Sequence, residues 1–386
     1  MRALRAEATP AVLRWARESA GFDLPLAAHR IGIADRKLAA AESGADRLTF
    51  PQLRKAADVY RRPLAAFFLP TPPPDQLPVP DFRRHRDTQV ELTPELRHEL
   101  RRLANKRSVA GQLSGDVDVD WSFVGSMSLQ TTVAAAAGKV RSLLRFDDLD
   151  GRRFRDEYDM FSARRRAVER LGVLVFLVRR ISASEARGFS LAMQPWPVIA
   201  IVRSDTPRAR VFTLLHEFVH ILLGRSALCD DLASEGSQDS PEARAIEAFC
   251  NKVAAEALMP ASTVRAAARS AGQRGDWSET RLRPMAQTFG VSMEAVLLRL
   301  VDLQLASRND YLAFLRAMQA RPLPDDEAAF GEKTHDLVLR TQGPTFVRLV
   351  LDAMHSAAIT AADVADYLDM NLKHLDALER AVMDLE

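Results

Sequence analysis

The chain has 386 residues, 47% of them hydrophobic and 27% charged, which is the composition of a globular protein with two or three domains. The 17 glycines, 4 tryptophans and 4 tyrosines argue against an all-β architecture, and 2 cysteines exclude both a disulfide framework and a four-thiolate zinc site. The net charge of +2 conceals a basic N-terminal part, because residues 1–110 hold 20 Lys and Arg against 13 Asp and Glu. This excess of positive charge fits either nucleic-acid contact or a solvated arginine-rich surface.

Five short helices are predicted in the first 70 residues. Apolar periodicity, capping residues and prolines place them, in chain order, at residues 10–20, 24–31, 35–42, 49–60 and 64–69. The second and third are separated only by Gly32, Ile33 and Ala34, a short turn typical of a helix-turn-helix. The third offers only Arg36 and Lys37 to a DNA major groove. These two side chains are candidate DNA contacts, and the alternatives are phosphate contact, solvated surface or a unit that binds a protein partner.

A proline-rich segment separates these helices from the rest of the chain. Residues 69–82 contain six prolines, which exclude a helix interior and indicate an extended linker. We therefore expect a helix-turn-helix domain at 1–70, a linker at 71–90, a second domain at 91–265 with its core at 125–265, and a helical region at 266–386.

Beyond the linker, the pattern predicts helices and one small sheet. Helices are expected at 93–113, 128–144 and 155–171, and again from residue 208 onward, including 346–354 and 359–382. Short apolar runs predict strands at 173–178, 188–192 and 197–202. The arginines at 164–166 are expected on a solvated face. The predicted fold class is therefore mostly α with a small β-sheet (α+β).

Residues 210–224, RVFTLLHEFVHILLG, contain the pattern His-Glu-x-x-His at His216, Glu217 and His220. On a helix the two histidines lie about one turn apart on one face, so both imidazoles can reach one metal ion. Glu217 projects about 100° round the helix, toward a metal-bound water. The helix is apolar nearly all round and hence buried, where these three side chains are costly unless they are paired. This favours a metal site over core histidines satisfied by hydrogen bonds.

A catalytic zinc usually takes a third protein ligand and keeps one open position. The next predicted helix, at 240–259, carries Glu247 in its middle and on its apolar side. Other carboxylates compete on chemistry alone, at the start of that helix or in the polar loop before it: Glu242, Glu235, Asp239 and Asp231. The residues alone favour Glu247, because a mid-helix carboxylate on an apolar face needs a partner, and they leave the competitors open.

These segments together resemble the ImmA/IrrE-type metallopeptidases. RVFTLLHEFVHILL and the later IEAFCNKVAAEALMP match the family's HExxH helix and its second motif, in which a glutamate stands four residues before an asparagine, here Glu247 and Asn251. The strand-forming runs are similar as well, so the resemblance covers about 125–265. Val219 stands where the family usually has glycine, and Val211 interrupts its usual Arg-Phe-Thr. Neither departure removes a ligand.

The resemblance implies a zincin-like minimal metallopeptidase core in which His216, His220 and Glu247 bind Zn²⁺ and Glu217 is the general base. The helices before residue 70 resemble the XRE-type helix-turn-helix that often precedes this bacterial peptidase. The implied substrate is a protein, typically an XRE-type repressor cleaved in a stress or mobile-element response.

A second interpretation is a DNA-binding regulator, or an antitoxin-type partner of a toxin, in which the zinc fold senses or docks. A structural zinc site is least favoured, because such sites usually have four protein ligands.

The sequence also bears on location and assembly. No apolar run approaches the ~18 residues that a membrane span needs, and the N-terminus lacks the apolar stretch of a secretory signal. We therefore expect a cytoplasmic protein without a membrane segment. Homo-oligomerisation is compatible with the sequence.

Overall fold

The computed structural model describes residues 5–74, 92–115, 119–149, 152, 154–181, 185–229, 241–270, 277–319 and 333–384. The chain divides into two compact units, Met1–Pro80 with Arg86–Ala104, and Asp81–His85 with Asn105–Glu386. The boundary falls within helix α5 (Pro94–Leu113). Most of the expected linker at 71–90 lies outside the described residues. The predicted domain limits stay a prediction.

The first unit contains the five predicted helices. Their bounds are α1 (Pro10–Ser19), α2 (Leu24–Ile31), α3 (Asp35–Ser43), α4 (Phe50–Tyr60) and the 3₁₀ helix η1 (Leu64–Phe68). Gly32 ends α2 in the left-handed conformation, at φ 82°, which glycine adopts without steric cost. Thr49 caps α4 through its side chain and forms a capping box with Gln52. Local signals of this kind explain why the helix positions could be read from the sequence.

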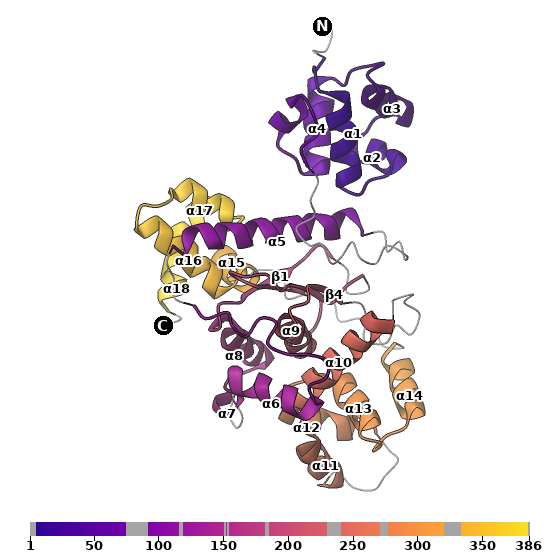
Figure 1. Cartoon of the computed structure of the whole chain (residues 1–386), viewed down its shortest axis with the longest axis vertical. Helices are drawn as coiled ribbons and strands as arrows, with labels where there is room; N and C mark the ends of the chain where they lie inside the picture. Colours follow the sequence, from indigo (N-terminus) through magenta and orange to yellow (C-terminus); the bar gives the residue numbers. More distant parts are fainter. Residues whose placement is uncertain are drawn as a thin grey trace. The chain divides into compact units, whose positions relative to one another are not determined.

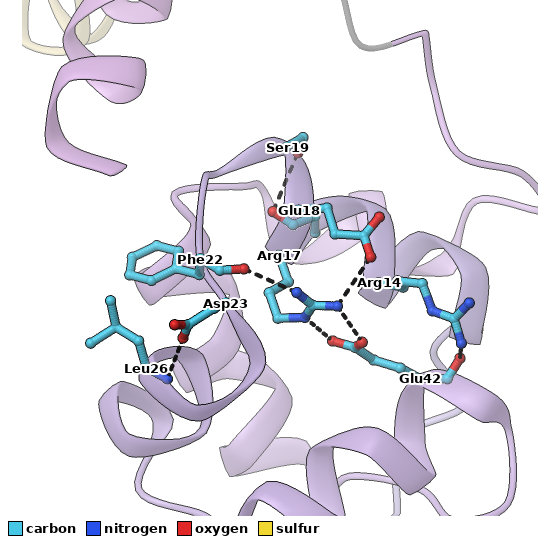
Figure 2. Close-up of polar contacts among 9 residues, drawn as sticks. Arg14, Arg17, Glu18, Ser19, Phe22, Asp23, Leu26 and Glu42 are labelled. Atoms are coloured by element: carbon cyan, nitrogen blue, oxygen red, sulfur yellow. Dashed lines mark hydrogen bonds and ion pairs between the residues drawn. The ribbon is translucent and has the colours of Figure 1, made fainter. Parts of the chain in front are cut away.

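A buried ion pair joins α1 to α3 in this unit. Arg17 donates from Nε and Nη2 to the two carboxylate oxygens of Glu42, at 2.8 and 2.9 Å, and from Nη1 to the Phe22 carbonyl at 3.0 Å (Figure 2). The Arg17 and Glu42 side chains are only 11% and 3% exposed. The bidentate geometry satisfies both charges where water does not reach them. The pair therefore fixes α3 against α1.

We expect Arg17→Met to lower the unfolding free energy of the first unit by about 3–5 kcal/mol, because it leaves the Glu42 carboxylate buried without its cation. Hydrogen exchange of the α1–α4 amides in the full chain measures this loss. The double variant Arg17→Met/Glu42→Leu should recover most of it. A single variant as well protected as the wild type would contradict the prediction.

The second unit is built on one small sheet. It contains β1 (Leu174–Val178), β2 (Gly188–Leu191), β3 (Val198–Val202) and β4 (Ala227–Cys229), in the order β1-β3-β2-β4. β1 and β3 are parallel, and β2 is antiparallel to both β3 and β4. The three predicted strands are confirmed, and β4 was not predicted. Every residue of β1, β2 and β3 is buried, so helices cover both faces of the sheet.

The two faces of the sheet have different covers. On one, Val175 and Ile199 belong to the core cluster that includes residues of α8 (Glu157–Glu169) and α9 (Pro207–Leu222). On the other, α15 (Thr334–Gln342) packs on β1, and the ring of Phe176 contacts that of Phe346 in α16 (Pro344–His355), with centroids 5.5 Å apart. Figure 1 shows the sheet between α9 and α15. The C-terminal helices thus complete the fold of this unit.

The expected solvated face at 164–166 is wrong, because Arg164 and Arg165 are buried. Arg165 pairs with Glu169 at 2.9 Å between Nε and Oε1, and it also donates to the carbonyls of Val175 in β1 and Arg340 in α15. Local periodicity could not show this, because the helix that buries Arg165 follows it by about 170 residues.

The remaining elements are helical and surround this core: α6 (Val133–Leu143), α7 (Phe146–Leu149), α10 (Pro241–Leu258), α11 (Ala261–Ser270), α12 (Glu279–Phe289), α13 (Met293–Asp302), α14 (Arg308–Gln319), α17 (Ala361–Tyr367), η4 (Leu372–His374) and α18 (Leu375–Met383). The predicted fold class, mostly α with a small sheet, is confirmed. Among the described helices, none has the length and apolar character needed to cross a membrane.

Candidate metal centre

Helix α9 carries the His-Glu-x-x-His pattern through the interior of the second unit. It starts at Pro207, where the Thr206 side chain accepts a hydrogen bond from an amide of the first turn. It packs against the sheet, α8 and α10. His216, Glu217 and His220 are 4%, 0% and 1% exposed. The apolar flanks of the motif therefore bury the helix, as the sequence predicted.

The side chain of Glu247 on α10 meets the two histidines. His216 Nε2 lies 3.1 Å from one carboxylate oxygen of Glu247, and His220 Nε2 lies 3.3 Å from the other. The two Nε2 atoms are 3.0 Å apart. These three residues form a group whose ligand atoms all lie within 4.8 Å of one another. Two imidazole nitrogens and a carboxylate so placed could hold one metal ion.

Asn251, one turn after Glu247, orients the first histidine. Its Oδ1 lies 2.8 Å from His216 Nδ1, so Nδ1 donates this hydrogen bond and Nε2 faces the other ligand atoms. A second hydrogen bond of this kind is typical of metal-binding histidines, because it fixes both the tautomer and the ring orientation.

The site stabilises positive charge between its ligand atoms. Burial raises the pKa of Glu247, but hydrogen bonds from His216 and His220 outweigh it, so this pKa lies well below its usual range. Burial lowers the pKa of His216, but its hydrogen bond to Glu247 and the charges of Glu247 and Glu217 outweigh this and raise it. A metal ion that binds here therefore displaces a proton, and its affinity should weaken as pH falls.

The Glu217 carboxylate occupies a space that strand β2 leaves open. A Cβ atom at Gly188 would lie 3.0 Å from Glu217 Oε1, 2.7 Å from Thr213 Cγ2 and 2.9 Å from the Ala200 carbonyl. Any side chain at position 188 would push against the carboxylate and the sheet. Gly188 was not among the predicted site residues, although a glycine in a strand is a known signal of close approach.

Residues 168–301 match the family model of the IrrE N-terminal-like domain, peptidase family M78. No curated protein matches the chain. The matched segment runs from the end of α8 into α13 and contains the sheet, α9 and α10. This part of the chain is therefore similar to an ImmA/IrrE-type peptidase domain, and the match supports peptidase activity in general.

The matched IrrE N-terminal-like domain differs in extent from the segment expected by resemblance. The match begins well after residue 125 and continues past 265, through α11, α12 and most of α13. Residues of α12 and α13 share the apolar core cluster with α9 and α10, which explains why the domain reaches so far.

The competing carboxylates stand apart from this group or lie outside the described residues. Glu242, at the start of α10, is exposed and pairs with Arg225 at 3.2 Å. Asp231, Glu235 and Asp239 fall in the segment that the structure does not describe. Among the described residues, Glu247 is thus the carboxylate that joins the two histidines.

The two cysteines of the chain lie on different elements of this unit, α10 and β4. Cys250 is buried, and its burial, followed by the charges of Glu247 and Glu217, raises the pKa of its thiol well above the usual value. It is therefore held as a neutral thiol. Cys229 ends β4, and its side chain lies outside the described part.

The candidate DNA contacts belong to the other unit. Arg36 and Lys37 occupy the first turn of α3, where Arg36 is exposed and Lys37 is half-buried. Their position is compatible with phosphate contact, and their role stays a prediction.

Proposed function

We propose that this chain is a cytoplasmic zinc-dependent endopeptidase that cleaves a protein substrate, an XRE-type repressor, in a stress or mobile-element response. One observation carries the proposal. The ligand atoms of His216, His220 and Glu247 lie within 4.8 Å of one another, beside the buried Glu217, in a segment that matches a peptidase family.

The donor set supports zinc as the metal. Two imidazoles and one carboxylate are the ligands of many catalytic zinc sites, which keep a further position open for water or substrate. For His216, Asn251 supplies the second hydrogen bond that is typical of metal-binding histidines. His216, His220 and Glu247 would hold the ion, and Glu217 would stay outside its ligand set.

The residues divide the chemistry between them. When bound, zinc would supply Lewis-acid polarisation of the scissile carbonyl. Glu217 accepts the proton of the attacking water as general base and then delivers it to the leaving amine. Asn251 keeps His216 in the tautomer whose unprotonated Nε2 can bind the ion. Both His216 and Glu217 are almost excluded from bulk water, which strengthens these charge interactions.

The test of the proposal uses the zinc-loaded full chain and the XRE-type repressors encoded beside its gene. We expect specific cleavage of one of them, seen as two fragments by mass spectrometry. Dialysis against a chelator should abolish the cleavage, and stoichiometric Zn²⁺ should restore it. A fully zinc-loaded chain that leaves these repressors intact would contradict the proposed substrate.

A second candidate function is supported by the basic N-terminal part and the exposed Arg36 at the start of α3. In this second function the chain binds DNA as an XRE-type regulator, or acts as an antitoxin-type partner of a toxin. The metal site would then serve as a sensor or as a docking surface.

We expect the full chain to bind duplex DNA weakly and with little sequence preference. Its affinity should fall steeply with salt, because phosphate contacts release counterions. Fluorescence anisotropy with the chain's own promoter and a scrambled duplex at about 150 mM salt, where the Debye length is ~8 Å, measures this. Tight binding to the promoter alone, lost in Arg36→Ala or Lys37→Ala, would contradict the expectation and favour a transcription factor.

A further inference from the structure

Strand β2 buries one hydroxyl between apolar neighbours along the strand and across the sheet. Ser190 is 0% exposed, and its Oγ has no hydrogen-bond partner among the described residues. Its neighbours along the strand are Phe189 and Leu191, and across the sheet it pairs with Ile199 and Ala227. Burying a hydroxyl without a partner destabilises a fold, so a serine at this position calls for a reason other than packing.

The Ser190 side chain faces helix α9. Residues two apart on a strand point to the same face, so Ser190 shares its face with Gly188. The missing Cβ of Gly188 would point at Thr213 and Glu217, both on α9. Ile199, directly opposite Ser190, lies in the core cluster that contains the apolar residues of α9. Both observations place the hydroxyl in the layer between β2 and α9.

The level of Ser190 along α9 follows from the connections at the two ends of the helix. Helix α9 begins five residues after the end of β3, and this end of β3 lies beside the start of β2. The helix ends shortly before Ala227, the β4 residue that pairs with Ser190. The helix therefore runs in the same direction as β2. Two strand residues span about 6.8 Å, close to one helical turn of 5.4 Å. Since Gly188 lies against Glu217, Ser190 lies opposite the turn that begins at Glu217.

We propose that Ser190 is a positioning residue for the peptidase reaction. Because Ser190 Oγ lies beyond direct hydrogen-bond reach of Glu217, the link is one buried water. The hydroxyl donates to this water, and the water donates to the Glu217 carboxylate and holds it in the space that Gly188 leaves open. The hydroxyl takes no part in bond making or breaking. This inference rests on the proposed function, because it assigns a task to the general base named there.

The test compares two variants of nearly the same shape, Ser190→Thr and Ser190→Val, which differ only in the hydroxyl. Both add a branch to the same strand position, so any steric effect is shared. We expect Ser190→Val to have a kcat about 10–100-fold below that of Ser190→Thr, the range for loss of an outer-shell partner, with KM within about twofold. Equal kcat values for the two variants would overturn the proposal. Ser114→Ala, which removes a hydroxyl bonded to Trp196 Nε1, is the control and should keep wild-type kcat.

A second measurement does not depend on peptidase activity. The urea midpoints of Ser190→Thr and Ser190→Val are compared in the full chain, with Glu217 present and with Glu217→Ala. If the hydroxyl is linked to Glu217 through a water, the midpoint of the threonine variant should drop relative to the valine variant once Glu217 is removed. The same difference in both backgrounds would overturn the contact. If the wild type cleaves no substrate but the coupling is present, the proposed function fails and the contact between Ser190 and Glu217 stands.

Discussion

Replacing Glu217 by glutamine should abolish cleavage and leave the fold and the bound metal in place. Glutamine has nearly the same volume and fits the space opposite Gly188, but its amide cannot accept a proton from water. General acid–base catalysis contributes about 10²–10⁴-fold to such reactions, so we expect kcat to fall by at least this factor. Metal content by mass spectrometry and cleavage of the cognate repressor provide the two measurements.

Glu242→Gln is the matched control for this variant. It makes the same chemical change on an exposed glutamate that pairs with Arg225, and it should cleave at the wild-type rate. Loss of bound metal in Glu217→Gln would place Glu217 among the ligands and contradict its role as general base. An unchanged biological output in that variant would favour the regulator over the enzyme.

Replacing Glu247 by alanine should remove most of the bound metal. In the proposed site this carboxylate would provide the oxygen ligand, and its two oxygens lie 3.1 and 3.3 Å from the histidine Nε2 atoms. We expect metal affinity to fall by more than the 10–100-fold that loss of an outer-shell partner costs. His216→Ala and His220→Ala should have similar effects. In the wild type, affinity should weaken as pH falls, because a raised His216 pKa lets protons compete with the metal already at mildly acidic pH.

Glu242→Ala separates a true ligand from a general loss of negative charge. It removes a carboxylate from the same helix, five residues earlier, and should keep about one metal per chain. Metal retained in Glu247→Ala and lost in Glu242→Ala would show that the third ligand had been wrongly assigned. Isothermal titration of the metal-free variants with Zn²⁺ at pH 7 and at pH 5.5 measures both the ligand and the pH dependence.

Local patterns were sufficient for most of the elements. The helices of the first unit have caps, prolines and turns that act within a few residues, such as the capping box at Thr49, and were therefore predictable. The strands β1, β2 and β3 are apolar runs long enough to recognise. β4 has three residues, too few to show a period, and is defined only by its pairing with β2.

What the sequence could not provide was contact between distant segments. The meeting of Glu247 with the two histidines was inferred from a mid-helix carboxylate and a family motif, while the distances needed the packing of α10 on α9. The roles of Gly188 and Ser190 depend on strand register, which no local pattern encodes. Arg165 was misjudged because the helices that bury it come near the end of the chain.

Helices α15 and α16, which cover the second face of the sheet, limit how far the chain can be truncated. A fragment of residues 168–301 would keep helix α9 and all four strands but lose α15 and α16. Phe176 and its neighbours on that face would then meet solvent as an apolar sheet surface, the kind that drives aggregation. An insoluble or inactive fragment would therefore say nothing about the activity of the whole chain, and a shortened version for activity tests has to retain α15 and α16.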